Sequence, residues 1–200
     1  MRRNTAILIF ENVEVLDFAG PLEVFSTADE LSEKNSFRVF TVAEAPGTIR
    51  TNNGLKIIPE HTLESSPVAD LLIVPGGFGT RALLNKPSVI EWIRVAAKRA
   101  EIVASVCTGA LLLAKAGLLN NQPATTHYLT YDLLREIAPT ALIHEDRRFL
   151  DNGPIATSAG ISAGIDLSLH LVARLQDATT AEKTARHMEY HWRNDGGLQR

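Results

Sequence analysis

The chain has 200 residues, of which 45% are hydrophobic and 22% are charged, and its formal net charge is −3. These proportions are close to those of soluble globular proteins, and the length permits one α/β domain with a full hydrophobic core. The basic residues build no long stripe, which argues against a nucleic-acid surface. A single cysteine excludes an internal disulfide.

The amino-terminal segment predicts neither a secretory signal nor a membrane anchor. Met-Arg-Arg-Asn leads directly into the apolar run 5–10, which is shorter than the hydrophobic region of a signal peptide. No stretch approaches the roughly 20 apolar residues that a membrane-spanning helix needs. We therefore expect a cytoplasmic protein with neither a membrane nor a nucleic acid as its partner.

Apolar runs alternate with longer periodic stretches, a pattern typical of βαβ units around a mainly parallel sheet. A first strand at 5–10 and a turn at 11–17 lead into a predicted helix over 19–33. Strands follow at 37–43 and 70–75, and then a helix over 88–99. A strand at 102–106 is followed by a helix over 108–119, which is expected to end near Gly117. Shorter strands near 141–150 and 155–157 precede two last helices, over 162–176 and 179–193. The pattern predicts a single α/β domain over residues 1–200.

Cys107 lies where the strand at 102–106 gives way to a helix. A side chain at such an elbow points into the crevice at the carboxyl end of the sheet, where ligands of open α/β folds bind. The N–H groups at the start of the helix favour an anion, so we expect a low thiol pKa and a place for developing negative charge. The small neighbours Ser105 and Gly109 suit a sharp turn. A buried structural cysteine is an equal alternative from position alone.

Pro75-Gly76-Gly77-Phe78-Gly79 follows the strand at 70–75 directly. Three glycines let the backbone approach a ligand with its N–H groups pointing inward. The segment has neither the Gly-Lys-Ser/Thr ending of a phosphate loop nor a dinucleotide fingerprint. Taken alone, it is an ordinary turn between a strand and a helix.

Asp17 lies between Leu16 and Phe18, just before the helix predicted to begin at residue 19. The common role of an aspartate there is a helix N-cap. The functional alternative is an acid near the crevice, with a pKa raised by apolar surroundings, that transfers a proton. Both stay open at this point.

Two groups of histidines remain. His127, in Thr125-Thr126-His127-Tyr128, could return to the crevice to orient a substrate or carry a proton, although a satisfied buried histidine is the more common case. His187 and His191 are spaced for a metal on one helix face, but no third ligand is evident. We expect no metal site and no cofactor.

Five motifs together resemble one family: Gly-Pro-Leu-Glu-Val-Phe at 20–25, Pro-Gly-Gly-Phe-Gly at 75–79, Ser-Val-Cys-Thr-Gly-Ala at 105–110, Ala-Thr-Thr-His at 124–127 and Thr-Ser-Ala-Gly-Ile-Ser-Ala-Gly-Ile-Asp at 157–166. The chain is similar to the ThiJ/PfpI group of the class I glutamine amidotransferase-like superfamily over nearly its whole length. The resemblance implies a flavodoxin-like three-layer α/β/α sandwich, a nucleophilic cysteine at Cys107 and a homodimer.

Details within the group favour its isocyanide hydratase branch. An aspartate, Asp17, stands where many relatives have a glutamate, and Thr108 follows Cys107 where the protease-like branch has a histidine. This resemblance implies a small-molecule substrate that is hydrated to an N-substituted formamide. Cys107 would attack the isocyanide carbon and Asp17 would act as acid and base. The predicted substrate- and oxyanion-binding residues are Gly77, Phe78, Thr108, Gly109 and His127.

The same motifs also resemble the sensing domain of AraC-type transcription regulators. Those chains continue into a helix-turn-helix region, for which this sequence leaves no room after Trp192, so a free-standing sensor would act through a partner. Cys107 would then be a redox or ligand contact. A third alternative is a glyoxalase or deglycase. A carboxyl within hydrogen-bond reach of the Cys107 sulfur would favour catalysis over sensing.

Overall fold

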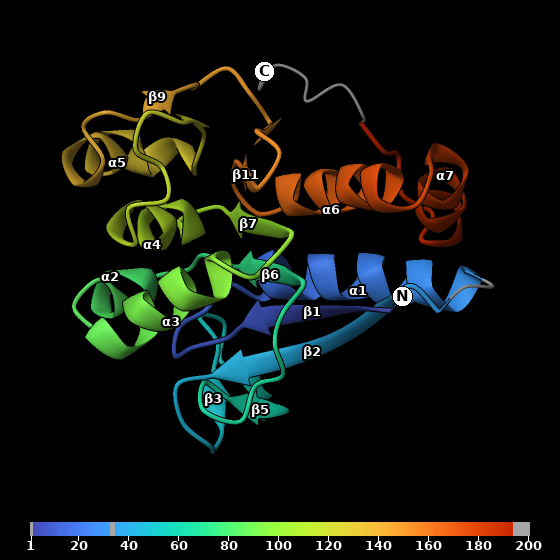
Figure 1. Ribbon diagram of the computed structural model, residues 1–200, viewed down its shortest axis with the longest axis horizontal. Helices are drawn as coiled ribbons and strands as arrows, with labels where there is room; N and C mark the ends of the chain where they lie inside the picture. The colour runs from blue at the N-terminus through green and yellow to red at the C-terminus, as the bar shows by residue number, and fades with distance from the viewer. Residues whose placement is uncertain (1, 33–34, 194–200) are drawn as a thin grey trace.

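The computed structural model describes residues 2–32 and 35–193, and a seven-stranded sheet runs through this part of the chain (Figure 1). In spatial order its strands are β10 (Phe149–Asp151), β11 (Ile155–Ser158), β7 (Ile102–Val106), β6 (Leu71–Val74), β1 (Arg3–Leu8), β2 (Phe37–Ala43) and β5 (His61–Thr62). All neighbours in this sheet are parallel except β10, which is antiparallel to β11. The predicted, mainly parallel sheet is confirmed.

Helices cover the sheet in two groups, which Figure 1 shows to the right and to the left of its strands. The first group contains α1 (Val15–Leu31), α6 (Ala163–Leu175) and α7 (Ala178–His187). The second contains α2 (Thr80–Leu83), α3 (Pro87–Ala97), α4 (Gly109–Lys115) and α5 (Tyr131–Ile137). This arrangement confirms the three-layer α/β/α sandwich.

The central strands are buried along their whole length. Every residue of β6 and β7 is buried, and both strands are rich in β-branched and aliphatic side chains. Near-continuous apolar strands are typical of parallel sheets with helices on both faces. The carboxyl ends of four adjacent strands, β11, β7, β6 and β1, therefore form one rigid edge from which loops emerge.

Two helix boundaries differ from the prediction. The helix predicted over 19–33 begins at Val15 and ends at Leu31, and residue 33 lies outside the described residues. Gly20 does not mark the helix start. It lies within α1 at a close contact with α6, where an added Cβ would lie 2.9 Å from Ile165. The last helix ends at His187 and not at 193, because the following segment is bound to Asp166.

Several short elements were not predicted, because they are too short for a periodic pattern to identify them. They are α2, α5, a 3₁₀ turn (Tyr128–Thr130), an antiparallel pair of β3 (Ile49–Arg50) and β4 (Lys56–Ile57), and β8 (Pro123–Ala124). The parallel partner of β8 is β9 (Leu142–Ile143), which lies within the region 141–150 where short strands were predicted. Within the described ranges, no helix is long and apolar enough to cross a membrane.

Asp166 joins three segments of the chain from inside α6. It is fully buried and accepts hydrogen bonds from the guanidinium of Arg148, from the hydroxyl of Tyr190 at 3.0 Å and from the backbone N–H of Arg193 at 3.0 Å. A buried carboxylate with this many donors holds the segment after α7 against the helix layer.

Asp166→Asn is expected to lower the free energy of unfolding by about 3 kcal/mol, because it leaves the charge of Arg148 buried without its partner. Asp132→Asn is the matched control, since Asp132 pairs with Arg135 on the surface and is 96% exposed. That change is expected to lower the free energy by less than about 1 kcal/mol. Urea denaturation measures both, and equal effects would contradict the structural role of Asp166.

Candidate functional site

Cys107 lies at a strained elbow between β7 and α4. Its φ is 57°, a left-handed backbone conformation that few residues other than glycine adopt. The surrounding backbone holds it there: the N–H of Cys107 donates to the carbonyls of Ser158 and Ala159, and its own carbonyl accepts the hydroxyl of Thr126 at 2.9 Å. A strained residue fixed from both sides is typical of a functional position.

Gly109 explains why the turn after Cys107 can be this tight. A Cβ at position 109 would lie 2.0 Å from the carbonyl oxygen of Val74, so only glycine lets α4 begin against the end of β6. Gly109 is buried and does not line the cavity beside Cys107. The structure therefore does not place Gly109 among the residues in direct reach of a ligand in this cavity.

Asp17 lies in the first turn of α1 and is fully buried. The N-cap of that helix is Glu14, so the capping alternative for Asp17 is wrong. Oδ2 of Asp17 accepts the N–H of Gly76 at 3.0 Å, while Oδ1 is buried without an ordinary hydrogen-bond partner in the described part of the chain. One oxygen of the carboxyl is thus fixed by a backbone hydrogen bond, and the other can take part in proton transfer.

The carboxyl of Asp17 and the thiol of Cys107 form an interacting pair. Burial raises the pKa of Asp17 to about 7, although hydrogen bonds from Gly76 and Cys107 act in the opposite direction. Burial and the charge of Asp17 also raise the pKa of the Cys107 thiol. The low thiol pKa predicted from the helix start is not found, because these two effects exceed the hydrogen bonds of the Thr108 and Ile161 N–H groups. At neutral pH the pair can hold and exchange a proton.

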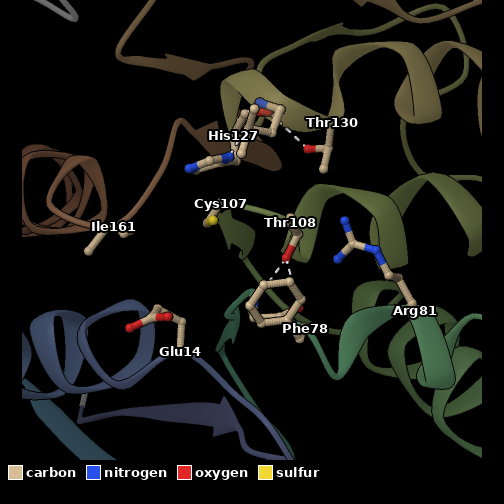
Figure 2. Close-up of a pocket in the computed structure, with 10 residues that line it drawn as sticks. Glu14, Phe78, Arg81, Cys107, Thr108, His127, Thr130 and Ile161 are labelled. Carbon is tan, nitrogen blue, oxygen red and sulfur yellow. Dashed lines mark hydrogen bonds between the residues drawn. The ribbon is translucent and has the colours of Figure 1, made fainter. Parts of the chain in front are cut away.

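A cavity of about 150 Å³ opens beside Cys107 (Figure 2). This volume is below the usual range of pockets for drug-sized ligands, so the cavity suits a small molecule. Four predicted binding residues lie in its wall, namely Gly77, Phe78, Thr108 and His127. The other lining residues are Glu14, Arg81, Cys107, Leu129, Thr130 and Ile161.

The backbone donors of the cavity differ from those that the sequence predicts. The N–H of Gly77 donates to the hydroxyl of Thr108 at 2.9 Å and is therefore occupied. The N–H groups that act on the sulfur of Cys107 belong to Thr108 and Ile161. Ile161 has a φ of 55°, which turns the chain back toward the elbow. Ile161 was not among the predicted site residues, although it follows Gly160 in the 157–166 motif.

His127 faces the cavity as a neutral side chain. Burial is the larger cause of the lowered pKa of His127, and the positive charge of Arg81 is the smaller one. Its Nδ1 accepts the N–H of Leu129 at 3.3 Å, so the neutral ring carries its proton on Nε2. An added Cβ on Gly160 would lie 2.3 Å from the ring, so glycine there is required to seat the imidazole.

In the sequence, Leu16, Phe18, Phe78 and Tyr128 lie within or beside the site motifs and suggest an apolar pocket, which the structure forms only in part. Phe78 lines the cavity, but Leu16, Phe18 and Tyr128 do not. Phe18 is buried in the core, whereas Tyr128 is 65% exposed. Arg81 and Glu14 are the charged residues that the sequence analysis missed, because neither belongs to a motif with a spacing that indicates a site.

This geometry defines a class: an α/β sandwich with a strained cysteine elbow at the carboxyl edge of its sheet, next to a buried carboxyl. The DJ-1/PfpI family profile matches residues 3–174, and the chain belongs to this family.

Three relatives extend the comparison. The chain is 35% identical to an isonitrile hydratase of Pseudomonas putida over 95% of its own length and 79% of that protein. It is 28% identical to the transcriptional regulator CdhR of Pseudomonas aeruginosa over 87% of its length, and it spans about half of that regulator. A crystal structure of a ThiJ/PfpI family protein from Pseudomonas syringae superimposes with a TM-score of 0.85 at 30% identity, covering 95% of this chain and 76% of that one.

Asp17→Asn is expected to change how stability depends on pH. A carboxyl whose pKa rises from 3.8 to about 7 on folding keeps its proton in the folded state while the unfolded chain loses it. The stability it contributes is therefore fully present below about pH 4 and is lost as the pH rises through about 7, by up to about 4 kcal/mol. The difference in free energy of unfolding between wild type and Asp17→Asn measures this loss. A difference that does not vary with pH would refute the raised pKa.

Proposed function

We propose that this protein hydrates small isocyanides, also called isonitriles, to N-substituted formamides. The observation that carries the proposal is the buried pair of Asp17 and Cys107 at the cavity. The 35% identity to an isonitrile hydratase over almost the whole chain supports it. The glyoxalase or deglycase alternative has no comparable support.

The pair can supply both groups that the reaction requires. A proton moves from the thiol of Cys107 to the carboxylate of Asp17. The raised pKa of Asp17 favours this transfer and the raised pKa of the thiol opposes it, so the proton leaves as the sulfur attacks the substrate. The thiolate then attacks the isocyanide carbon, and the protonated Asp17 delivers its proton to the same carbon. The product of this step is a thioimidate, with a new S–C bond and a C–H bond.

Water completes the reaction. Asp17, again a carboxylate, takes a proton from water while the hydroxide adds to the thioimidate carbon, and the proton is passed to the substrate nitrogen. The C–S bond then breaks, the hydroxyl loses its proton as the carbonyl forms, and Cys107 regains a proton. The sum is one isocyanide and one water converted to one formamide. The N–H groups of Thr108 and Ile161, which act on the sulfur, hold the leaving thiolate.

The assay uses para-nitrophenyl isocyanide and the smaller isocyanoacetamide, with formamide formation followed by mass spectrometry. Cys107→Ala is expected to reduce kcat/KM by at least about a thousandfold, and Asp17→Asn by about a hundredfold, because each removes a reacting group. Arg99→Gln, an exposed change outside the cavity, is the control for the substitution itself. Undiminished hydration by Cys107→Ala would contradict the mechanism.

A second candidate function is ligand sensing, which the similarity to the regulator CdhR supports. In that case the cavity binds a small molecule without converting it, and Cys107 is a contact or a redox-sensitive group. Wild-type protein with reduced Cys107 that binds isocyanoacetamide, but forms no formamide from either substrate, would favour sensing over catalysis.

A further inference from the structure

Arg81 brings an unpaired positive charge to the cavity. It lies in α2, and Figure 2 shows its guanidinium beside Thr108, on the side facing Thr130. The guanidinium carbon lies 5.8 Å from the ring centroid of Phe78, a cation–π contact that restricts the side chain to this wall. In residues 2–32 and 35–193 no carboxylate forms an ion pair with Arg81, unlike Arg148 or Arg174.

The positive charge of Arg81 also affects another residue of the cavity. Burial is the main cause of the lowered pKa of His127, which also lines the cavity, and the charge of Arg81 lowers it further. His127 is therefore neutral, and its ring proton on Nε2 is a further donor. The wall formed by Arg81 and His127 is consequently rich in donors and favours an anion or a strong acceptor.

The acidic groups of the cavity lie elsewhere. Glu14 comes from the start of α1, and Figure 2 shows it and Arg81 on different sides of Cys107. Oε2 of Glu14 accepts the side-chain amide of Asn52 at 3.3 Å, and Asp17 is fully buried and interacts with the thiol of Cys107. An anionic group on a ligand is therefore favoured at the α2 side and opposed at the α1 side.

We propose that Arg81 is a specificity-determining residue that selects substrates with a carboxylate whose carbon lies three bonds from the carbon that Cys107 attacks. The short separation follows from the cavity of about 150 Å³. A guanidinium can bind both oxygens of a carboxylate, which gives orientation as well as affinity. The proposal rests on the proposed isocyanide hydration and names the substrate class for it, with isocyanoacetate as the simplest example.

The test compares isocyanoacetate with isocyanoacetamide, which has nearly the same shape but no charge. For wild type we expect kcat/KM for the carboxylate to exceed that for the amide by about tenfold, mainly through KM. Arg81→Gln is expected to abolish this preference by lowering kcat/KM for the carboxylate more than for the amide, and Arg81→Lys to restore part of it. Arg99→Gln removes an equal charge from the surface outside the cavity and is expected to keep the preference.

The outcomes separate the two proposals. Hydration of both substrates without a preference, or equal effects of Arg81→Gln and Arg99→Gln, overturns the role of Arg81 and leaves isocyanide hydration standing. If neither isocyanide is hydrated, calorimetric measurement of the binding of N-formylglycine and N-formylglycinamide tests the anion-binding role of Arg81 independently of catalysis. Binding of N-formylglycine that weakens about tenfold in Arg81→Gln supports it. Equal binding of the charged and neutral probes to wild type overturns it.

Discussion

The left-handed backbone at Cys107 is the constraint on which the site depends. It can exist because the carbonyls of Ser158, at the end of β11, and of Ala159, directly after it, accept its N–H, and because Gly109 allows α4 to begin against the carbonyl of Val74. These contacts come from strands on both sides of β7 and belong to the rigid edge of the sheet. The sulfur is thereby fixed by the core of the fold and not by a flexible loop, which suits a reacting atom that needs one position.

The same edge explains why residues far apart in sequence meet. The strands β11, β7, β6 and β1 are neighbours, and the connections that leave their carboxyl ends carry Ile161, Cys107, the Gly76–Gly77 turn and Asp17. Parallel strands bring all these connections to one side of the sheet. Because glycine has no side chain, the backbone at these turns can approach its neighbours where a larger residue would collide. The N–H of Gly76 can therefore donate to Asp17 while Gly76 packs against Thr108.

The sequence predicted the layers, the central strands and the elbow cysteine, because long apolar periods and a strand followed by small residues are local signals. It did not predict the start of α1, since Asp17 before an apolar stretch has the pattern of an N-cap, whereas the helix begins at Val15 and Asp17 lies in its first turn. The thiol pKa was misjudged because burial and a neighbouring carboxylate are tertiary effects. Arg81 was missed for the same reason, as its role depends on which side chains surround it.

At the strained elbow, the residue that would stabilise the fold most differs from the residue that the proposed reaction requires. At φ near 57° the backbone would be relaxed by glycine, and asparagine would tolerate it better than cysteine does. A library of variants selected for thermal stability alone should therefore accumulate replacements at position 107, while selection for turnover should restore cysteine. The fold thus keeps a strained backbone at the position where the thiol is needed.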